Sequence, residues 1–334
     1  MTKYVLTSII DKDSKDAGPK AKNDIAYFLQ KKGYQPLDLN LPTKRSAKIK
    51  YVLFELKKVF KNLNASEIVF QYPIYSMFLT QRIIKTLKKT TQAKIYFVIH
   101  DVEALRDQKN NPKFIQAEQA LFQQVDGLIV HNENMKTYLQ KQGIKTLMVE
   151  LSLFDYLNEQ PLNEDFTYQK TLCYAGNLQK AAFLTKLKLT NTSCFVFGNN
   201  QAKTYPTGIF YQGSYSPDEL PKYLKQDFGL IWDGDSLTTG AGVFGEYTKY
   251  NAPHKTSLYL SSGLPVIVWQ KAGVAQFVKK NQVGLVVDNL TDLEEVLQNV
   301  SSKQYQLLKK NVLRVAQKLR TGGFIEEALA KLNK

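Results

Sequence analysis

The sequence contains little cysteine and little histidine, which narrows the metal and redox sites that it can form. Of its 334 residues, two are cysteines and three are histidines. Cys173 and Cys194 both lie in apolar, strand-like runs, and there is no CxxC, HExxH or Cys/His cluster. We therefore expect no structural zinc and a reducing compartment.

Long apolar runs are also missing. No run reaches the roughly 18 residues that cross a membrane. The apolar start, residues 1–10, is too short for a signal peptide and leads directly into Asp11, Lys12 and Asp13. We interpret it as a first buried strand and expect a cytoplasmic protein. A hydrophobic content of 43% is typical of a globular fold, and 334 residues suit two domains.

Acidic residues are scarce relative to basic ones, and the net charge is +15. Such a charge suggests an anionic partner: nucleic acid, membrane or substrate. The lysines are spread along predicted helix faces without interleaved aromatics, and no nucleic-acid motif is present. We expect no nucleic-acid binding, and we interpret most of the charge as a solvated surface. The alternative is a patch that contacts a membrane surface.

What the chain does have is a regular alternation of apolar strands and amphipathic helices. Strands are expected over residues 3–10, 34–39, 66–71, 94–99, 127–130 and 145–149, with helices between them that include 19–32 and 46–62. A second series follows, with strands over 171–175, 193–197, 209–211, 228–232, 265–269 and 285–287 and helices over 180–187 and 217–225. Repeated βα units predict parallel sheets covered on both faces.

This alternation predicts two doubly wound, Rossmann-like domains facing a central cleft. The first is expected over residues 1–152 and the second over 169–318, with an aperiodic linker at 153–168. The last segment, 319–334, is expected either to cross back to the first domain or to form an oligomer contact. In such folds the loops after the strands carry function.

The stretch 250–287 reads as helix, strand, helix and strand. Asn251 is a plausible N-cap before Pro253, and Lys255 and Thr256 follow in the first helical turn. Free amides and the positive dipole end of a helix, together with a lysine, suit a diphosphate. The alternative is a capped helix with a surface lysine.

A second set of polar residues ends a strand of the first half. His100 and Asp101 follow the predicted strand 94–99, and either could deprotonate or orient a hydroxyl. Arg106 could then bind an acceptor or a phosphate. A histidine at a strand end is more often structural, and we interpret His131 in that way.

The order of elements resembles the GT-B glycosyltransferases. Nearly the whole chain resembles, more narrowly, the glucosyltransferases of bacterial serine-rich-repeat adhesin glycosylation and related galactofuranosyltransferases. The segments that carry this resemblance are 16–25, 98–106, 174–178 with Lys180, 228–233 and 245–255.

The resemblance implies a UDP-sugar-dependent hexosyltransferase that needs no cofactor and no metal. It favours transfer of glucose from UDP-glucose to N-acetylglucosamine on a serine-rich adhesin, within a wider class of protein- or lipid-linked acceptors. We also expect a homo-oligomer. The implied donor-binding residues are Gly18, Asn177, Lys180, Tyr211, Asp233, Glu246, Asn251, Lys255 and Thr256.

The same resemblance assigns chemistry to a few side chains. Lys255 would stabilise the departing UDP, His100 or Asp101 would handle the acceptor hydroxyl, and Arg106 would bind the acceptor. Many retaining GT-B enzymes carry a pair of glutamates just before a Gly-Leu-Pro turn, and here Tyr250 and Leu258 occupy those positions. The stereochemistry of transfer is therefore left open.

Three other functions remain as alternatives. A galactofuranosyl or other hexosyl transferase of surface-polysaccharide synthesis would keep the site and change the donor and the acceptor. A UDP-sugar epimerase would consume the donor without an acceptor. A non-catalytic partner of another glycosyltransferase would bind protein and no nucleotide.

Overall fold

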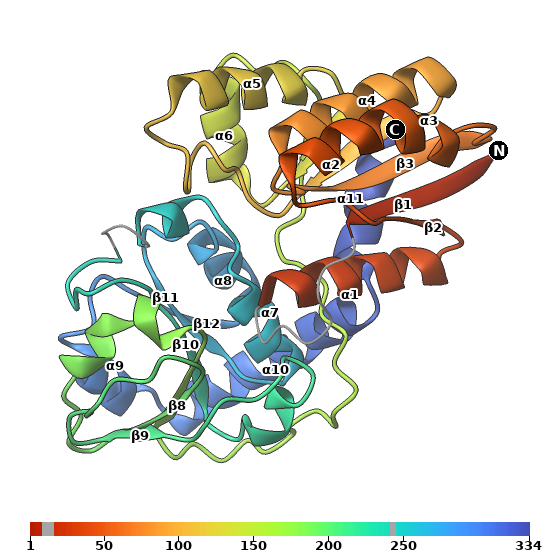
Figure 1. The fold of residues 1–334 in the computed structure, drawn as a ribbon. Helices are drawn as coiled ribbons and strands as arrows, with labels where there is room; N and C mark the ends of the chain where they lie inside the picture. The colour runs from red at the N-terminus through yellow and green to blue at the C-terminus, as the bar shows by residue number, and fades with distance from the viewer. Residues whose placement is uncertain (9–16, 241–244) are drawn as a thin grey trace. The chain divides into compact units, whose positions relative to one another are not determined.

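The computed structural model describes residues 1–8, 17–240 and 245–334. The chain forms two units, and each contains one sheet with helices packed against it (Figure 1). Unit 1 comprises the first strand, Lys22–Leu151 and Ile325–Lys334, and unit 2 comprises Ser152–Phe324 with the start of the first helix.

The sheet of unit 1 has six parallel strands in the order β2-β1-β3-β4-β5-β6. Its strands are β1 (Thr2–Ser8), β2 (Gln35–Leu39), β3 (Ala65–Tyr72), β4 (Lys94–Ile99), β5 (Gly127–Val130) and β6 (Met148–Glu150). β3, β4 and β5 are buried along nearly their whole length, as expected for strands that helices cover on both sides. The predicted parallel sheet of the first half is confirmed.

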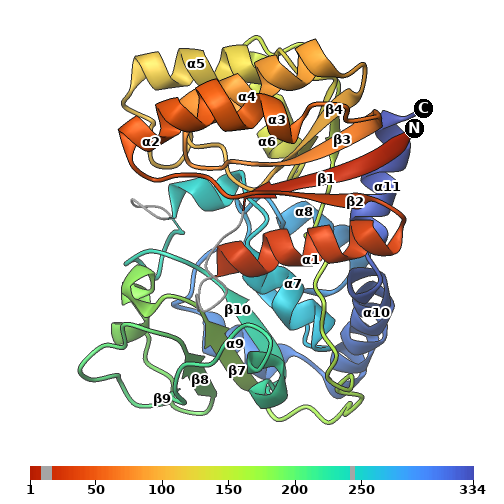
Figure 2. The same ribbon diagram turned by 45° about the vertical axis from the view of Figure 1, so that its right-hand side comes forward.

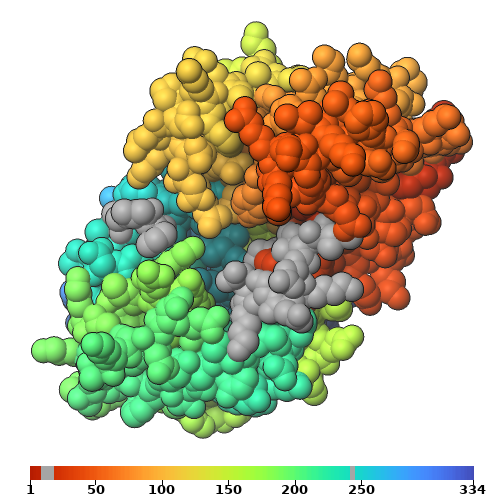
Figure 3. Space-filling view, in the orientation of Figure 1, coloured from red at the N-terminus to blue at the C-terminus, as the bar shows by residue number. Residues whose placement is uncertain are grey.

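Helices cover both faces of this sheet. α1 lies on one side, while α2, α3 and α4 lie on the other (Figure 2). In the space-filling view, the orange-red side chains of the α2 region lie at the surface (Figure 3). The helices are α1 (Ala17–Lys31), α2 (Arg45–Lys50), the π-helical turn η1 (Tyr51–Glu55), α3 (Leu56–Val59), α4 (Met77–Thr90), α5 (Pro112–Phe122) and α6 (Glu133–Lys141).

The single helix predicted over 46–62 is interrupted by the π-helical turn. No side chain before Leu56 in this segment is buried, so packing does not fix a regular helical register there.

Unit 2 contains a second parallel sheet, in the order β12-β11-β10-β7-β8-β9. Its strands are β7 (Thr171–Ala175), β8 (Ser193–Phe197), β9 (Ile209–Tyr211), β10 (Phe228–Ile231), β11 (Val266–Trp269) and β12 (Gly284–Val287). Its helices are α7 (His254–Ser261), α8 (Ala275–Asn281), α9 (Leu293–Asn299), α10 (Ser302–Arg320) and α11 (Gly323–Leu332), which ends in unit 1.

Two helices predicted for unit 2 are wrong. The segment predicted as a helix over 180–187 forms two 3₁₀ turns, η2 (Leu178–Lys180) and η3 (Ala182–Thr185), because Phe183 donates its amide to Gly234 of another loop. The helix predicted over 217–225 is a single 3₁₀ turn, η4 (Leu220–Tyr223). Pro221 lies inside that turn and has no amide to donate.

Two connecting segments are held by side chains. The aperiodic stretch 153–168 lies in unit 2, where Lys309 Nζ donates to the Asn163 carbonyl at 2.8 Å. Past α11, Asn333 accepts from the Tyr96 hydroxyl of β4 at 2.9 Å, which ties the end of the chain to unit 1. Within the described ranges, no helix has both the length and the apolar character needed to cross a bilayer.

Candidate functional site

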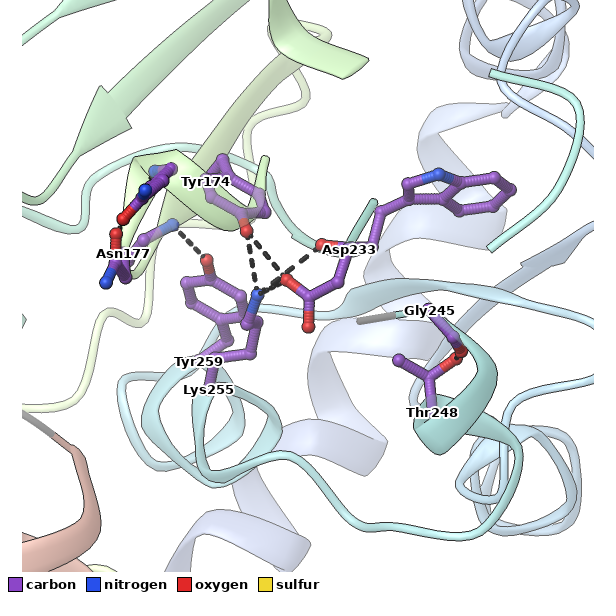
Figure 4. Close-up of polar contacts among 10 residues, drawn as sticks. Tyr174, Asn177, Asp233, Gly245, Thr248, Lys255 and Tyr259 are labelled. Carbon is purple, nitrogen blue, oxygen red and sulfur yellow. Dashed lines mark hydrogen bonds and ion pairs between the residues drawn. The ribbon is translucent and has the colours of Figure 1, made fainter. Parts of the chain in front are cut away.

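Lys255 is the centre of a polar cluster in unit 2. It lies in the first turn of α7, with Nζ 2.8 Å from Asp233 Oδ1 and 3.0 Å from the Tyr174 hydroxyl (Figure 4). Tyr174 belongs to β7 and Asp233 follows the neighbouring strand β10, so the sheet brings the two together. The Tyr174 hydroxyl also donates to Asp233 Oδ1 at 2.9 Å.

Burial, followed by the negative charge of Asp233, raises the pKa of Tyr174 well above its usual value. The hydroxyl therefore stays protonated. Lys255 also lies 4.4 Å from the centre of the Tyr174 ring, a cation–π distance. The cation is thus held in one place by a carboxylate and an aromatic ring before any ligand arrives.

Asn251 is not the N-cap that the sequence predicted. α7 begins at His254, and Pro253 occupies the cap position without a side-chain hydrogen bond. The ring of Pro253 disfavours a helical conformation for the residue before it, which prevents the helix from starting at Asn251. The first turn of α7 therefore keeps amides that no side chain caps.

Three buried polar atoms near this helix start have no hydrogen-bond partner among the described residues: Asn251 Oδ1, His254 Nε2 and Thr256 Oγ1. Thr256 is fully buried. Buried polar groups in folded proteins are nearly always paired, so three unpaired atoms within six residues need an explanation. A polar ligand at the start of α7 would supply the missing partners.

His254 was not singled out from the sequence, although its place directly before Lys255 was an available signal. Its ring packs against Tyr156, with centroids 4.8 Å apart. Burial, followed by the charge of Lys20, lowers the pKa of His254 to about 3. The imidazole is therefore neutral at physiological pH. Lys20 itself pairs with Asp218 at 3.0 Å and lies over the Tyr156 ring.

Glycines at the ends of neighbouring strands form a tightly packed backbone surface beside Lys255. A Cβ on Gly176 would lie 3.7 Å from Lys255 Nζ. A Cβ on Gly198, after β8, would lie 1.8 Å from the Gly176 carbonyl oxygen, and φ is +142° there, so only glycine fits. The hydroxyl of Tyr211 donates to the Gly198 carbonyl at 3.1 Å, which joins this exposed residue of β9 to the same surface.

Two other predicted donor residues belong to the loop after β7. Asn177 caps η2 by accepting from the Gln179 amide at 3.1 Å, and it also accepts from Asn200. The carbonyl of Lys180 accepts from the Gly234 amide at 2.7 Å, so this loop lies beside the loop that carries Asp233. The structure brings both residues into the neighbourhood of Lys255.

Glu246 and Gly18 are placed differently. Glu246 lies in η5 (Glu246–Lys249), is exposed, and forms an ion pair with Lys249 of the same turn at 2.7 Å. Gly18 lies in the first turn of α1 rather than in a preceding loop. The rest of these two predicted loops includes residues 9–16 and 241–244, which lie outside the described residues.

In unit 1, His100 and Asp101 follow β4 as predicted. His100 Nε2 is 3.0 Å from Gln71 Oε1 of β3, and the same Gln71 side chain donates to Thr7 of β1. Asp101 forms an ion pair with Arg106 at 2.5 Å. His131 is buried and lies 2.9 Å from the Ile99 carbonyl, a contact that fits the structural role predicted for it.

Further charged and aromatic residues surround Asp101 that the sequence did not reveal. Lys22 is buried, donates to the Pro73 carbonyl and lies 5.3 Å from the centre of the Tyr75 ring. Tyr75 is 59% exposed and has φ of +53°, a rare conformation for a bulky residue. The charge of Asp101 acts on both Lys22 and Tyr75.

Glu103 completes this group. Burial, followed by the charges of Glu118 and Asp101, raises the pKa of Glu103 to about 7. Glu118 accepts from the Tyr72 hydroxyl at 2.6 Å and from the amides of Glu103 and Ala104 at 3.0 Å. Carboxylates beside an exposed aromatic ring suit a neutral polyhydroxyl ligand. Among the described residues, no group of three or more His, Cys, Asp or Glu is placed to hold a metal ion.

Solved structures of glycosyltransferases share the fold. A sucrose-phosphate synthase from Thermosynechococcus elongatus superimposes with a TM-score of 0.62 and 12% identity, covering 99% of this chain and 98% of that one. WaaG, a glycosyltransferase of lipopolysaccharide biosynthesis, gives a TM-score of 0.58 and 14% identity over 97% and 98% of the two chains. The two parallel-sheet units therefore define a protein of the GT-B class.

Sequence comparison identifies the family. The models described as "Glucosyltransferase 3-like, N-terminal domain" and "Glucosyltransferase 3-like, C-terminal domain" match residues 3–153 and 172–332. The chain belongs to this family of glycosyltransferases.

Two relatives represent the range of named activities. The beta-1,6-galactofuranosyltransferase WbbI of Escherichia coli (strain K12) is 32% identical over 80% of this chain and 79% of its own length. Glucosyltransferase 3 of Streptococcus gordonii is 23% identical over 98% and 97% of the two chains.

Proposed function

We propose that this glycosyltransferase moves a hexose from a UDP-sugar to a hydroxyl of a sugar that is already attached to a protein or lipid carrier. The observation that carries the proposal is the start of α7, where Lys255 lies beside uncapped helix amides and the unpaired atoms of Asn251, His254 and Thr256. The oxygens of a diphosphate accept hydrogen bonds from amides, from a lysine and from the Thr256 hydroxyl, whereas Asn251 Oδ1 needs a donor such as a ribose hydroxyl of the nucleotide.

Lys255 would act most strongly late in the reaction. Negative charge grows on the leaving phosphate as the glycosidic bond to UDP breaks, and a fixed cation stabilises that charge. In the free protein Lys255 is paired with Asp233. We propose that the diphosphate takes over this ion pair, and that Asp233 then accepts hydrogen bonds from hydroxyls of the donor sugar. Transfer by this route requires no metal ion.

The acceptor is proposed to bind in unit 1, at the carboxyl ends of β3 and β4. Tyr75 offers an exposed ring for the apolar face of a sugar, and Arg106 with Asp101 offers partners for its hydroxyls. Either His100 or Asp101 would receive the proton of the attacking hydroxyl.

The proposed donor sugar is a hexose, with two candidates. The family description favours glucose, and N-acetylglucosamine on a serine-rich adhesin is the first acceptor to test. A second candidate is galactofuranose, favoured by the 32% identity to WbbI. TarM, an enzyme of the same fold with a TM-score of 0.55 and 15% identity, has been solved with UDP. That match covers 84% of this chain and 58% of TarM.

Calorimetry with UDP tests the donor site. We expect wild-type protein to bind UDP and Lys255→Ala to bind it at least about tenfold more weakly, roughly 1.4 kcal/mol. Lys303→Ala is the matched control, because Lys303 is an exposed lysine in the first turn of α10 of unit 2. Absence of UDP binding by the wild-type protein would contradict the proposal and favour a non-catalytic partner.

Two further measurements test whether Asp233 binds the donor sugar and which UDP-sugar is the donor. Asp233→Asn removes a negative charge beside the phosphates, so UDP should bind as well as before or more tightly, while binding of the full UDP-sugar weakens. UDP release is then measured with UDP-glucose and UDP-galactofuranose, each with and without an N-acetylglucosaminyl serine peptide. Consumption of the donor without any acceptor, with no free hexose formed, would indicate an epimerase.

A further inference from the structure

One helical segment of unit 1, Arg45–Glu55, contains no fully buried side chain. Neither α2 nor the π-helical turn η1 contains a buried residue, whereas α4 buries five side chains in the same unit. Helices in folded proteins gain most of their stability by packing an apolar face. The segment Arg45–Glu55 is therefore packed less completely against the rest of unit 1 than α4 is.

Several large apolar residues of this segment and of α3 face solvent, whereas Tyr51 and Val52 are half-buried. Ile49 is 48% exposed, Leu53 61%, Phe54 58% and Val59, at the end of α3, 38%. Single exposed apolar residues are common, but a cluster of large ones indicates an interaction surface. We call Ile49, Leu53, Phe54, Val59 and the basic residues around them the α2–α3 face.

The same residues are interleaved with positive charge. Glu55 is the only acidic residue between positions 44 and 61. The basic residues there are Lys44, Arg45, Lys48, Lys50, Lys57, Lys58 and Lys61. A helix with apolar side chains and many lysines matches the interfacial helices that lie on anionic bilayers.

The neighbouring helix extends the surface. Lys48 Nζ donates to the Ser76 hydroxyl at the start of α4 at 3.3 Å, and α3 contacts α4. Phe78, in the first turn of α4, is 40% exposed. The helices α2, α3 and α4 lie on one side of the sheet of unit 1 in both ribbon views, and the α2 region is at the surface in Figure 3.

We propose that the α2–α3 face binds an anionic lipid surface, with Ile49, Leu53 and Phe54 entering the interface and the lysines contacting headgroup phosphates. The positive charge of the α2–α3 face favours an anionic lipid surface over a second copy of the chain, because two such faces would repel each other. The inference refines the proposed function by favouring an acceptor at a membrane surface, but the binding itself requires neither donor nor acceptor.

Vesicle co-sedimentation tests the proposal without any sugar substrate. We expect the protein to bind phosphatidylcholine vesicles containing phosphatidylglycerol at least about tenfold more tightly than vesicles of phosphatidylcholine alone, and to be released by salt. The double variant Leu53→Glu/Phe54→Glu should lose about tenfold or more of this affinity. Leu307→Glu is the matched control, since Leu307 is a 51% exposed leucine on the lysine-rich α10 of unit 2.

A charge-reversal variant and two folding controls distinguish loss of lipid binding from misfolding. Lys50→Glu/Lys57→Glu changes only exposed positions and should weaken binding to the anionic vesicles alone. Circular dichroism and UDP calorimetry report whether each variant is folded. Unchanged vesicle binding by both double variants would overturn the proposal. So would an equal loss in the Leu307 control, or a loss of self-association in sedimentation velocity without a loss of vesicle binding.

Discussion

The two polar clusters of this protein differ in how completely their groups are paired. At the start of α7 in unit 2, a lysine lies beside unpaired buried atoms and uncapped amides. After β3 and β4 in unit 1, Glu118 accepts three hydrogen bonds, Asp101 pairs with Arg106, and Lys22 donates to a carbonyl.

The difference indicates different ligands. An anion at the start of α7 would bind helix amides and the unpaired Thr256 hydroxyl, and it would compete for Lys255 with Asp233, the Tyr174 hydroxyl and the Trp232 carbonyl. An internally paired, carboxylate-rich site with an exposed ring suits a neutral sugar, which adds contacts without disturbing charge. The difference fits the proposal of a diphosphate in unit 2 and an acceptor sugar in unit 1.

The largest expected effect is that of replacing Lys255 in unit 2. Lys255→Ala should lower kcat for transfer by about 100-fold or more, roughly 2.7 kcal/mol, because the charge on the leaving phosphate loses its fixed cation. Steady-state kinetics with saturating acceptor measures this. If Lys255→Ala raised only the KM for the acceptor, the two assignments would be reversed.

Acid should destabilise unit 2 through His254. Its pKa is about 3 in the fold, against 6.5 for an ordinary histidine, so the unfolded chain binds more protons between these values. Stability is therefore lost as pH falls below about 6.5. Between pH 7 and pH 5 this one group should cost about 2 kcal/mol.

Tryptophan fluorescence during urea unfolding measures that effect, because Trp232 and Trp269, the only tryptophans, both lie in unit 2. His254→Phe keeps a ring against Tyr156. It should reduce the change in unfolding free energy between pH 7 and pH 5 by about 2 kcal/mol. An identical pH slope in the variant would show that His254 is not buried as a neutral group.

Unit 1 should respond to pH in the opposite direction through Glu103. Its pKa is raised from 4.5 to about 7, so the folded state holds the proton more tightly. The stabilisation is complete below about pH 4.5 and is lost as pH rises through about 7. Because the side chain is partly exposed, we expect about 1–2 kcal/mol.

Hydrogen exchange of β3 and β4 amides, compared between wild type and Glu103→Gln from pH 5 to pH 8, measures this loss. The glutamine variant should show the smaller pH-dependent change in protection once the intrinsic exchange rate is removed. A wild-type sheet that becomes more protected at high pH would contradict the assignment.

The smallest effect is expected at the exposed ring of unit 1. Tyr75→Ala should raise the KM for a soluble sugar acceptor about fivefold, near 1 kcal/mol, and leave UDP affinity unchanged. Tyr27→Ala on α1 is the control, because Tyr27 is 38% exposed and lies outside the cluster. Equal effects from the two variants would remove Tyr75 from the acceptor site.

Sequence patterns predicted the fold well and the helix boundaries less well. The alternation of apolar strands and helices gave both parallel sheets, because it reflects burial on two faces. The prediction of a helix failed where a contact distant in sequence decided, as at η2 and η3, where the Phe183 amide bonds to Gly234 rather than within its own turn. The predicted cap at Asn251 failed because the effect of Pro253 on the preceding residue prevailed.

The sequence by itself determined the two βα series, the family resemblance and the location of Lys255 at the start of a helix. These features depend on periodicity and short motifs, which neighbouring residues specify. Only the tertiary structure decided that Lys255 meets Tyr174, 81 positions away, and that Lys22 lies over Tyr75 beside Asp101. These contacts depend on which strands are neighbours in the sheet, and a local sequence pattern does not specify the order of the strands.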